Sequence, residues 1–123
     1  MKKRNTLLRI ILPLLAVGSV AVVSCAAPAG GGDRFAYAIS DSGLARLRAC
    51  ESGGNYSAVN PTGTYRGAYQ FSRTTWNSVA SRYYPHLNGV DPARAAPWDQ
   101  DRMARALWAT AGRGQWPHCG LKV

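Results

Sequence analysis

Three cysteines, Cys25, Cys50 and Cys119, are the feature that most restricts how this chain can fold. Cys25 ends an N-terminal segment with the pattern of an export signal, so the protein is expected in an oxidising compartment, where disulfides persist. In an exported protein with an odd number of cysteines, at least one cysteine is left out of the intramolecular disulfides. We therefore expect Cys50 and Cys119 to form a disulfide, with two unrelated buried thiols as the alternative. A domain this small needs such a cross-link, because its core alone provides little net stability.

Residues 1–24 are predicted to be a signal peptide that is removed on maturation. Residues 2–4 are basic and residues 7–23 are mostly apolar, which is the order found in export signals. A membrane-spanning anchor is the alternative. It is disfavoured because Arg9, Pro13 and Gly18 interrupt the apolar run, which leaves fewer than the roughly 20 apolar residues that a span needs.

The signal ends in the string VVSC at residues 22–25, which resembles the bacterial lipobox. In a lipobox, small residues precede a cysteine that becomes the lipid-modified N-terminus of the mature protein. The resemblance implies that Cys25 carries a lipid and attaches the protein to the cell membrane, to an extent set by the number of acyl chains. Ordinary signal cleavage nearby, followed by secretion, is the alternative.

The net charge of +9 overstates the basicity of the exported protein. Four of the 15 Lys and Arg residues lie in the signal, so 11 remain against 6 Asp and Glu, a net charge of +5. A basic exported domain is attracted to polyanions, which at a bacterial surface are cell-wall polymers or anionic lipids. Nucleic acid is the other polyanion to consider, but the sequence has no recognition motif for it, and we do not expect it as a partner.

The exported chain divides into a linker over residues 25–40 and one domain over residues 41–120. The linker contains the string APAGGGD and has little to bury, so we expect it to be flexible. The domain is predicted to be α+β and mainly helical, with two short extended arms and a turn over residues 55–71. Apolar spacing, N-caps and helix breakers predict three helices. These run from Asp41 or Ser42 to the glycine pair 53–54, from a Ser72 cap to just before Pro85, and from near Trp98 to Gly112.

Glu51 is the only glutamate of the chain and lies in or just after the last turn of the first predicted helix. The negative end of the helix dipole disfavours a charged carboxyl at this place. This direction suits an acid that must hold a proton. Glu51 is therefore the candidate general acid/base.

The strings CESGGN, TYRGAYQF, TTW and WPHC together resemble the catalytic domain of resuscitation-promoting factors, which are actinobacterial peptidoglycan-cleaving proteins. Within these strings, Glu51 and Ser52 followed by Gly67 and Gln70 are similar to the ES and GxxQ arrangement of lysozyme-like lytic transglycosylases. The similarity covers residues 44–120. It implies a compact lysozyme-like fold with a cleft for glycan strands of alternating N-acetylglucosamine and N-acetylmuramic acid.

The resemblance also implies roles for particular residues. It makes Glu51 catalytic and joins Cys50 to Cys119. It assigns the binding of the glycan to three residues of the cleft, Tyr65, Gln70 and Thr75. The alternative for these three is structural: Gln70 would fix the turn, Thr75 would belong to the first turn of a helix, and Tyr65 would be part of the core.

The residue types are consistent with glycosidic cleavage. A carboxylic acid with a raised pKa can protonate the leaving oxygen, but ordinary glycosidases use a second carboxylate. Beyond the first predicted helix the domain offers only Asp91, Asp99 and Asp101, and none adjoins the cleft motifs. We therefore expect cleavage by Glu51 alone, giving a 1,6-anhydro sugar. Hydrolysis by a muramidase is one alternative, and a non-catalytic wall-binding lipoprotein is another. A third is a growth-stimulating signalling role, which would still rest on cleavage.

Other residues restrict the interpretation. His86 and His118 lack the spacing of metal ligands, so we expect no metal and no cofactor, and we expect a monomer. Helical spacing places Trp76 and Trp108 in the core. Arg66 departs from the resemblance, because another aromatic or a small residue is expected beside Tyr65. Residues 83–98 also form a longer stretch than the shortest members of the family need.

Overall fold

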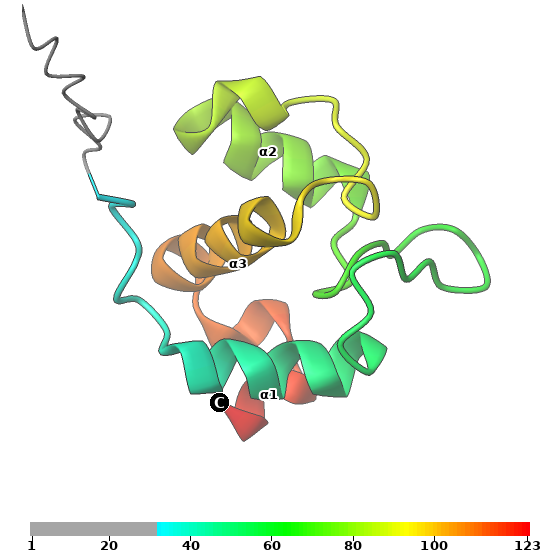
Figure 1. Cartoon of the computed structure of the whole chain (residues 1–123), viewed down its shortest axis with the longest axis vertical. Helices are drawn as coiled ribbons and strands as arrows, with labels where there is room; N and C mark the ends of the chain where they lie inside the picture. The colour runs from blue at the N-terminus through cyan, green and yellow to red at the C-terminus, as the bar shows by residue number, and fades with distance from the viewer. Residues whose placement is uncertain (1–31) are drawn as a thin grey trace, which may run out of the picture.

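The structure is a computed structural model that describes residues 32–123 (Figure 1). The predicted signal peptide and lipidation site lie outside the described residues. The described chain is mainly helical. Its elements are α1 (Asp41–Ser52), α2 (Arg73–Tyr83), the short 3-10 helix η1 (Pro85–Leu87), α3 (Pro97–Ala111), and two further 3-10 helices, η2 (Arg113–Gln115) and η3 (Cys119–Lys122).

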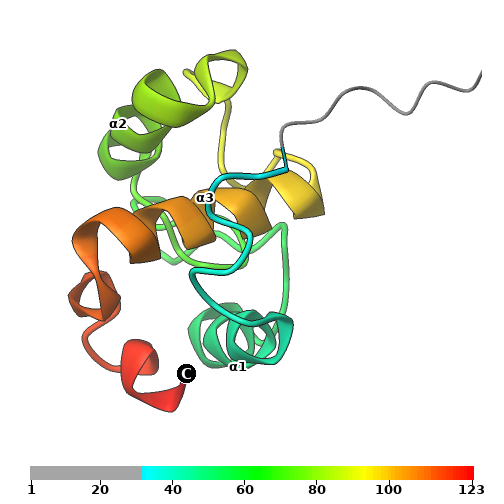
Figure 2. The same cartoon turned by 90° about the vertical axis from the view of Figure 1, so that its left-hand side faces the viewer.

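Helix α3 runs through the middle of the domain, with α2 on one side and α1 on the other (Figures 1 and 2). After α3 the chain turns back through η2 and η3 and ends beside α1. The N-terminal helix and the C-terminal segment are therefore neighbours.

Local signals fix most helix ends. Ser72 caps α2 as predicted, because its Oγ accepts a hydrogen bond from the Thr75 backbone N–H. The N-cap of α1 is Ser40, whereas Asp41 or Ser42 was the predicted cap, and the Ser40 Oγ accepts a hydrogen bond from the Gly43 N–H. Helix α1 ends at Ser52 and is capped by Gly53, whose φ of 66° is a left-handed conformation that glycine adopts without a steric penalty.

The segment between α1 and α2 has the predicted irregular β and turn character. Among the described residues its β-structure consists of two isolated antiparallel bridges, Val59 with Arg66 and Arg66 with Phe71. Arg66 and Phe71 exchange two backbone hydrogen bonds of 2.9 Å across the turn 67–70. The turn is closed without a regular hairpin.

One hydrophobic core joins all three helices to this turn. Helix α3 contributes buried residues on one face, among them Met103 and Leu107, because they recur at helical spacing. The two buried indoles of the described residues also satisfy their N–H groups: Trp76 donates to the Leu87 carbonyl at 2.9 Å and Trp116 to the Tyr69 carbonyl at 3.0 Å. The expectation that Trp76 is a core residue is confirmed, since its side chain is fully buried.

Residues 33–39, which we call the strap, pack against the domain, whereas the sequence predicted a flexible linker up to residue 40. Ile39 is buried in the core, and the Phe35 ring meets Tyr83 edge to face at 5.0 Å between centroids. Figure 2 shows the strap crossing α3. Phe35 and Ile39, two apolar side chains spaced four residues apart, thus attach this segment to the domain.

The predicted disulfide between Cys50 and Cys119 is present and joins α1 to η3. It closes a span of 69 residues, for which the chain-entropy model gives a stabilisation of about 4 kcal/mol. In residues 32–123, no helix has the length and apolar character required to cross a membrane.

Candidate active site

A cleft of about 350 Å³ lies beside the end of α1. Glu51 lines it together with Tyr65 and Gln70 from the turn region. The opposite wall comes from the C-terminal segment, as Gln115, Trp116, Pro117, His118 and Cys119. A smaller hollow of about 60 Å³ adjoins the cleft and is lined by Thr75. Three residues predicted from the sequence thus share one cleft, and the fourth, Thr75, lies at its extension.

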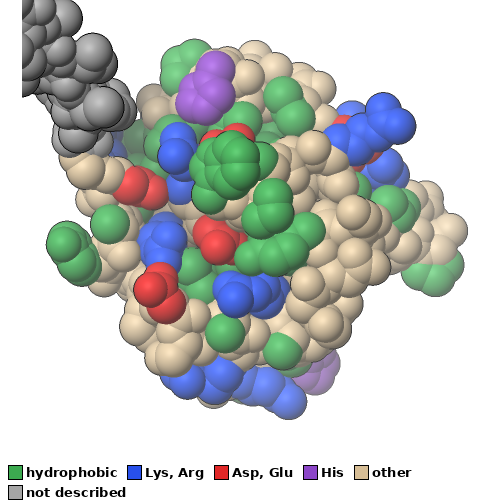
Figure 3. Space-filling view, in the orientation of Figure 1, with side chains coloured by type: hydrophobic (Ala, Val, Ile, Leu, Met, Phe, Trp, Pro, Cys, Tyr) green, Lys and Arg blue, Asp and Glu red, His purple; other side chains and the backbone are tan. Residues whose placement is uncertain are grey.

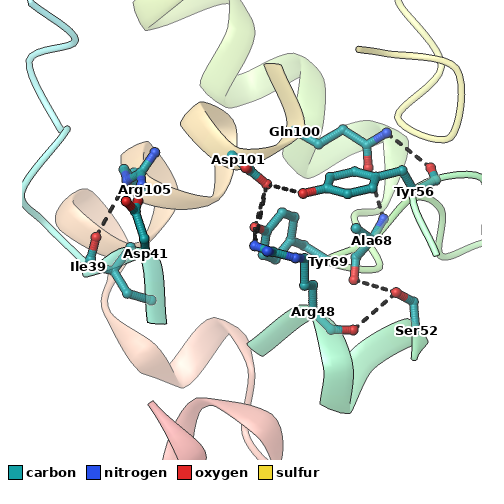
Figure 4. A network of polar contacts seen from close by, with 10 residues as sticks. All are labelled: Ile39, Asp41, Arg48, Ser52, Tyr56, Ala68, Tyr69, Gln100, Asp101 and Arg105. Atoms are coloured by element: carbon teal, nitrogen blue, oxygen red, sulfur yellow. Dashed lines mark hydrogen bonds and ion pairs between the residues drawn. The ribbon is translucent and has the colours of Figure 1, made fainter. Parts of the chain in front are cut away.

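Two attachments fix the part of α1 that carries Glu51. On one side Cys50 is bonded to Cys119. On the other, the Ser52 hydroxyl lies 2.8 Å from the Ala68 carbonyl oxygen and 3.1 Å from that of Arg48 (Figure 4). Glu51 therefore sits between a covalent bond to one wall of the cleft and a hydrogen bond to the other.

Burial raises the pKa of the half-buried Glu51 carboxyl, because the ionised form loses solvation. The positive charge of His118 acts in the opposite direction and is the smaller effect. The sequence predicted the direction of this shift from the helix dipole. The structure gives the same direction with desolvation as the cause.

Gln70 has a strained backbone in the turn that faces Glu51. Its φ of 54° is the only positive φ of a non-glycine residue in the described part of the chain. Its side-chain amide donates to the Gly67 carbonyl at 3.0 Å, which leaves the amide oxygen as a free acceptor. Strain of this kind persists where the surroundings impose it and is common at ligand sites.

Thr75 also has a structural partner. The Ser72 hydroxyl lies 3.0 Å from Thr75 Oγ1 and accepts from the Thr75 N–H at 3.1 Å. The half-exposed Tyr65, in contrast, is not a core residue. The alternative that Tyr65 is a core residue is therefore wrong. Gln70 and Thr75 do make the structural contacts of the alternative, and they also line the cleft or its extension.

The side chain of Gln100 fixes the turn at residues 67–70 by hydrogen bonding. Its side chain is fully buried and makes three hydrogen bonds: it accepts from the Ala68 N–H at 2.8 Å and donates to the carbonyls of Tyr56 and Ala95 at 3.0 and 2.9 Å. A Cβ on Gly67 would lie 2.5 Å from Gln100 Oε1. Gly67 is thus required here both for its φ of 81° and for its lack of a side chain.

The three aspartates considered as a second carboxylate all have other partners. Asp101 accepts from the hydroxyls of Tyr56 and Tyr69 at 2.8 and 2.6 Å (Figure 4). Asp99 pairs with Arg102. Asp91 accepts a hydrogen bond from Arg66. None of the three aspartates lines the cleft. Of the cleft residues that the structure describes, Glu51 alone carries a carboxyl group.

Arg66 is explained by its pairing with Asp91. Its Nε and a terminal nitrogen donate to the two carboxylate oxygens at 2.7 and 2.6 Å, a geometry that favours arginine over other cations. Hydrogen bonding from Arg66 lowers the pKa of Asp91 to about 2. The pair ties the turn region to the loop before α3, so Arg66 is a structural residue beside the cleft.

The C-terminal wall of the cleft was not predicted from the sequence. Trp116 is a core residue that lines the cleft and stacks on Trp108, with 6.0 Å between ring centroids. Trp108, predicted to be core, is partly buried against it. The string WPHC could have indicated this wall, because its cysteine, Cys119, forms a disulfide with Cys50, the residue before Glu51. Within residues 32–123, no three His, Cys, Asp or Glu side chains lie together as metal ligands would.

Comparison with known proteins gives one family. A family model described as "Transglycosylase-like domain" matches residues 38–119. The chain is 43% identical over 76 residues to "Probable transglycosylase SceD" of Staphylococcus epidermidis, a match that covers 62% of this chain and 33% of that protein. It is 47% identical over 73 residues to "Probable transglycosylase SceD" of Staphylococcus aureus (strain Newman), covering 59% and 30%. The chain thus spans about a third of the length of these curated relatives.

Proposed function

The chain belongs to the transglycosylase-like domain family, and from this membership we propose that it is a lytic transglycosylase of peptidoglycan. The bond broken is the β-1,4 link between N-acetylmuramic acid and N-acetylglucosamine, and Glu51 is the acid and then the base. The observation that carries the proposal is a cleft whose single carboxyl has a pKa raised by burial.

The reaction needs one carboxyl group. Protonated Glu51 gives its proton to the glycosidic oxygen, and the C–O bond breaks while the N-acetyl oxygen of muramic acid attacks the anomeric carbon. The carboxylate of Glu51 then removes the proton of the 6-hydroxyl of the same sugar, whose oxygen displaces the N-acetyl oxygen. The product is a 1,6-anhydro sugar, and Glu51 ends protonated, as it began.

The remaining cleft residues fit a glycan ligand. The free amide oxygen of Gln70 and the hydroxyl of Thr75 suit N-acetyl and hydroxyl groups, and the exposed ring of Tyr65 offers an apolar face with a polar tip. Trp116 and His118 extend the wall opposite Glu51. The lysozyme-like fold, and a place among resuscitation-promoting factors, belong to the same proposal, supported by the helical architecture and the strings around Glu51.

The test is digestion of purified cell wall by the wild-type protein and by Glu51→Gln, followed by mass spectrometry of the soluble muropeptides. Wild-type products should be lighter by one water than hydrated reducing ends, and Glu51→Gln should release none. Hydrated ends alone would indicate a muramidase. Equal release by both proteins would contradict the role of Glu51, and no release by either would leave a wall-binding role only.

We also propose export and a lipid anchor at Cys25, on the strength of the basic and apolar N-terminal sequence and its VVSC end. The domain would then act at the cell wall from the outer face of the membrane. Cys25→Ser should move the protein from the membrane fraction to the medium. An unchanged distribution would contradict the anchor and leave secretion or another attachment.

A further inference from the structure

A second cavity, of about 380 Å³, lies where the strap meets α2 and α3. We call it the arginine pocket, after the residues that carry its charge and shape: Asp33, Arg34, Arg82, Tyr83, Tyr84 and Arg102. It shares no lining residue with the Glu51 cleft. Neither the proposed reaction nor the resemblance uses it.

The three arginines come from three different elements. Arg34 belongs to the strap, Arg82 to the last turn of α2 and Arg102 to α3. The Arg34 guanidinium lies 6.0 Å from the Tyr83 ring centroid, and that of Arg102 lies 5.4 Å from the Tyr84 ring centroid. Such stacking orients a guanidinium plane and leaves its N–H groups at the edge to bind an anion.

Two acids lie close to these arginines, and both are engaged. Asp33 Oδ1 accepts from the Tyr84 hydroxyl at 2.7 Å and from the Phe35 N–H at 3.1 Å. Asp99 pairs with Arg102 at 3.5 Å. Figure 3 shows acidic and basic side chains next to one another on the face beside the grey N-terminal atoms. With three arginines and one aspartate in its lining, the pocket keeps an excess of positive charge.

The position of the pocket suggests where its anion comes from. Its first charged residue, Asp33, is only eight positions after Cys25, a length of chain that reaches at most about 29 Å when fully extended. A lipid on Cys25 would hold the pocket within that distance of the membrane surface, where phospholipid phosphates are the abundant anions.

We propose that the arginine pocket binds the phosphate of an anionic phospholipid headgroup and so seats the domain on the membrane. Guanidinium groups bind phosphate oxygens in a bidentate manner, and the flanking tyrosines suit the glycerol part of a headgroup. The proposal takes the source of the phosphate from the lipid anchor proposed at Cys25. It is independent of the reaction at Glu51.

The test uses the mature chain from residue 25 with Cys25→Ser, so that no acyl chain contributes. Co-sedimentation is measured with vesicles of phosphatidylcholine alone and with 30% phosphatidylglycerol. Arg34→Gln with Arg82→Gln should weaken binding to the anionic vesicles about 25-fold, taking about a factor of five per arginine. The charge-matched control, Arg94→Gln with Arg113→Gln, removes two exposed arginines outside the pocket and should weaken it less than about threefold.

If both double variants lost binding to the anionic vesicles equally, net charge alone would attract the domain to the membrane. This result would overturn the proposal. A second measurement does not depend on variants: soluble dihexanoyl phosphatidylglycerol should shift the NMR signals of Phe35, Tyr83 and Arg102 in the otherwise unaltered protein. Shifts confined to other residues would overturn the proposal, as would preference for a soluble glycerol-phosphate polymer over the vesicles. Muropeptide release by the pocket variant should equal that of the parent, which separates this proposal from the proposed function.

Discussion

Glu51 is held in a place that is unfavourable for its ionised form. Burial in the cleft raises the pKa of its carboxyl, and the charge of His118 offsets this only in part. An acid that donates a proton near neutral pH benefits from this environment. This environment lowers the stability of the folded state when Glu51 is ionised, since the carboxylate is better solvated in the unfolded chain.

Replacement of this carboxyl should therefore stabilise the protein. Because the pKa of Glu51 is higher in the folded state, the folded protein binds more protons than the unfolded chain, and stability falls as pH rises through the interval between the two pKa values. Glu51→Gln lacks this fall. We expect its melting temperature to equal that of the wild type at low pH and to exceed it at neutral pH. Thermal melts from pH 3 to 8 measure this, and identical curves would contradict the role of burial.

Gln100 is the residue on which the geometry of the cleft turn depends. Gln100→Ala would leave the Ala68 N–H and the carbonyls of Tyr56 and Ala95 without partners in a buried site. The expected loss in free energy of unfolding is about 2–4 kcal/mol, with reduced muropeptide release because the turn that carries Gln70 loosens. Urea denaturation gives the first quantity. The exposed amide Asn88→Ala is the control and should change stability by less than about 0.5 kcal/mol.

Among the elements, helix ends were the most predictable feature and tertiary partners the least. Ser72 and Gly53 act on backbone groups within a few residues, so the sequence pattern is sufficient for them. Nothing local reveals that Gln100, inside an amphipathic helix, supports a turn more than 30 residues away. The start of α3 was also hard to predict from the sequence, because its N-cap residue, Ala96, makes no side-chain hydrogen bond to the helix.

The candidate site was predictable to the extent that it lies in one stretch of sequence. Glu51, Tyr65 and Gln70 belong to strings whose pattern carries the resemblance, and the structure brings them into one cleft. The opposite wall, with Trp116 and His118, depends on where the chain returns after α3. Only the pairing of Cys50 with Cys119 pointed to that return.

The Arg66–Asp91 pair links the turn region to the loop before α3 and should contribute to stability in a pH-dependent way. The pKa of Asp91 is lowered to about 2 in the folded state, so its contribution is present above the pKa of the unfolded chain and is lost as pH falls towards 2. Asp91→Asn should reduce the free energy of unfolding by about 1 kcal/mol at pH 7, after allowance for solvent screening. Denaturation at pH 7 and pH 2.5 measures this, and an equal difference at both would contradict it.

In the whole molecule, the disulfide connects the two walls of the cleft. The Cys50→Ala, Cys119→Ala double variant should lose about 4 kcal/mol of stability. It should also lose activity at temperatures where it is still folded, because the wall that carries Trp116 and His118 is then free to move away from Glu51. Circular dichroism and muropeptide release, measured in parallel in a Cys25→Ser background, separate the two effects. Activity that follows the folded fraction alone would contradict the second.

The strap extends the domain beyond its predicted boundary and adds a contact at the opposite end of α1. Arg105 on α3 donates to the Ile39 carbonyl at 3.4 Å and pairs with Asp41 in the first turn of α1 (Figure 4). Helix α1 is therefore fixed at both ends, by this contact at its start and by Ser52 and Cys50 at its end. A rigid α1 keeps Glu51 in place relative to the cleft.

The span of the disulfide has a consequence for proteolysis. It joins two cysteines that lie 69 positions apart. The chain between them includes the exposed turn at residues 61–64 and the loop at residues 88–96, and exposed loops are preferred sites of cleavage. One cut at either place yields two fragments, the first with Glu51 and the second with His118. The fragments stay covalently joined, so the two walls of the cleft separate only after reduction or further cleavage.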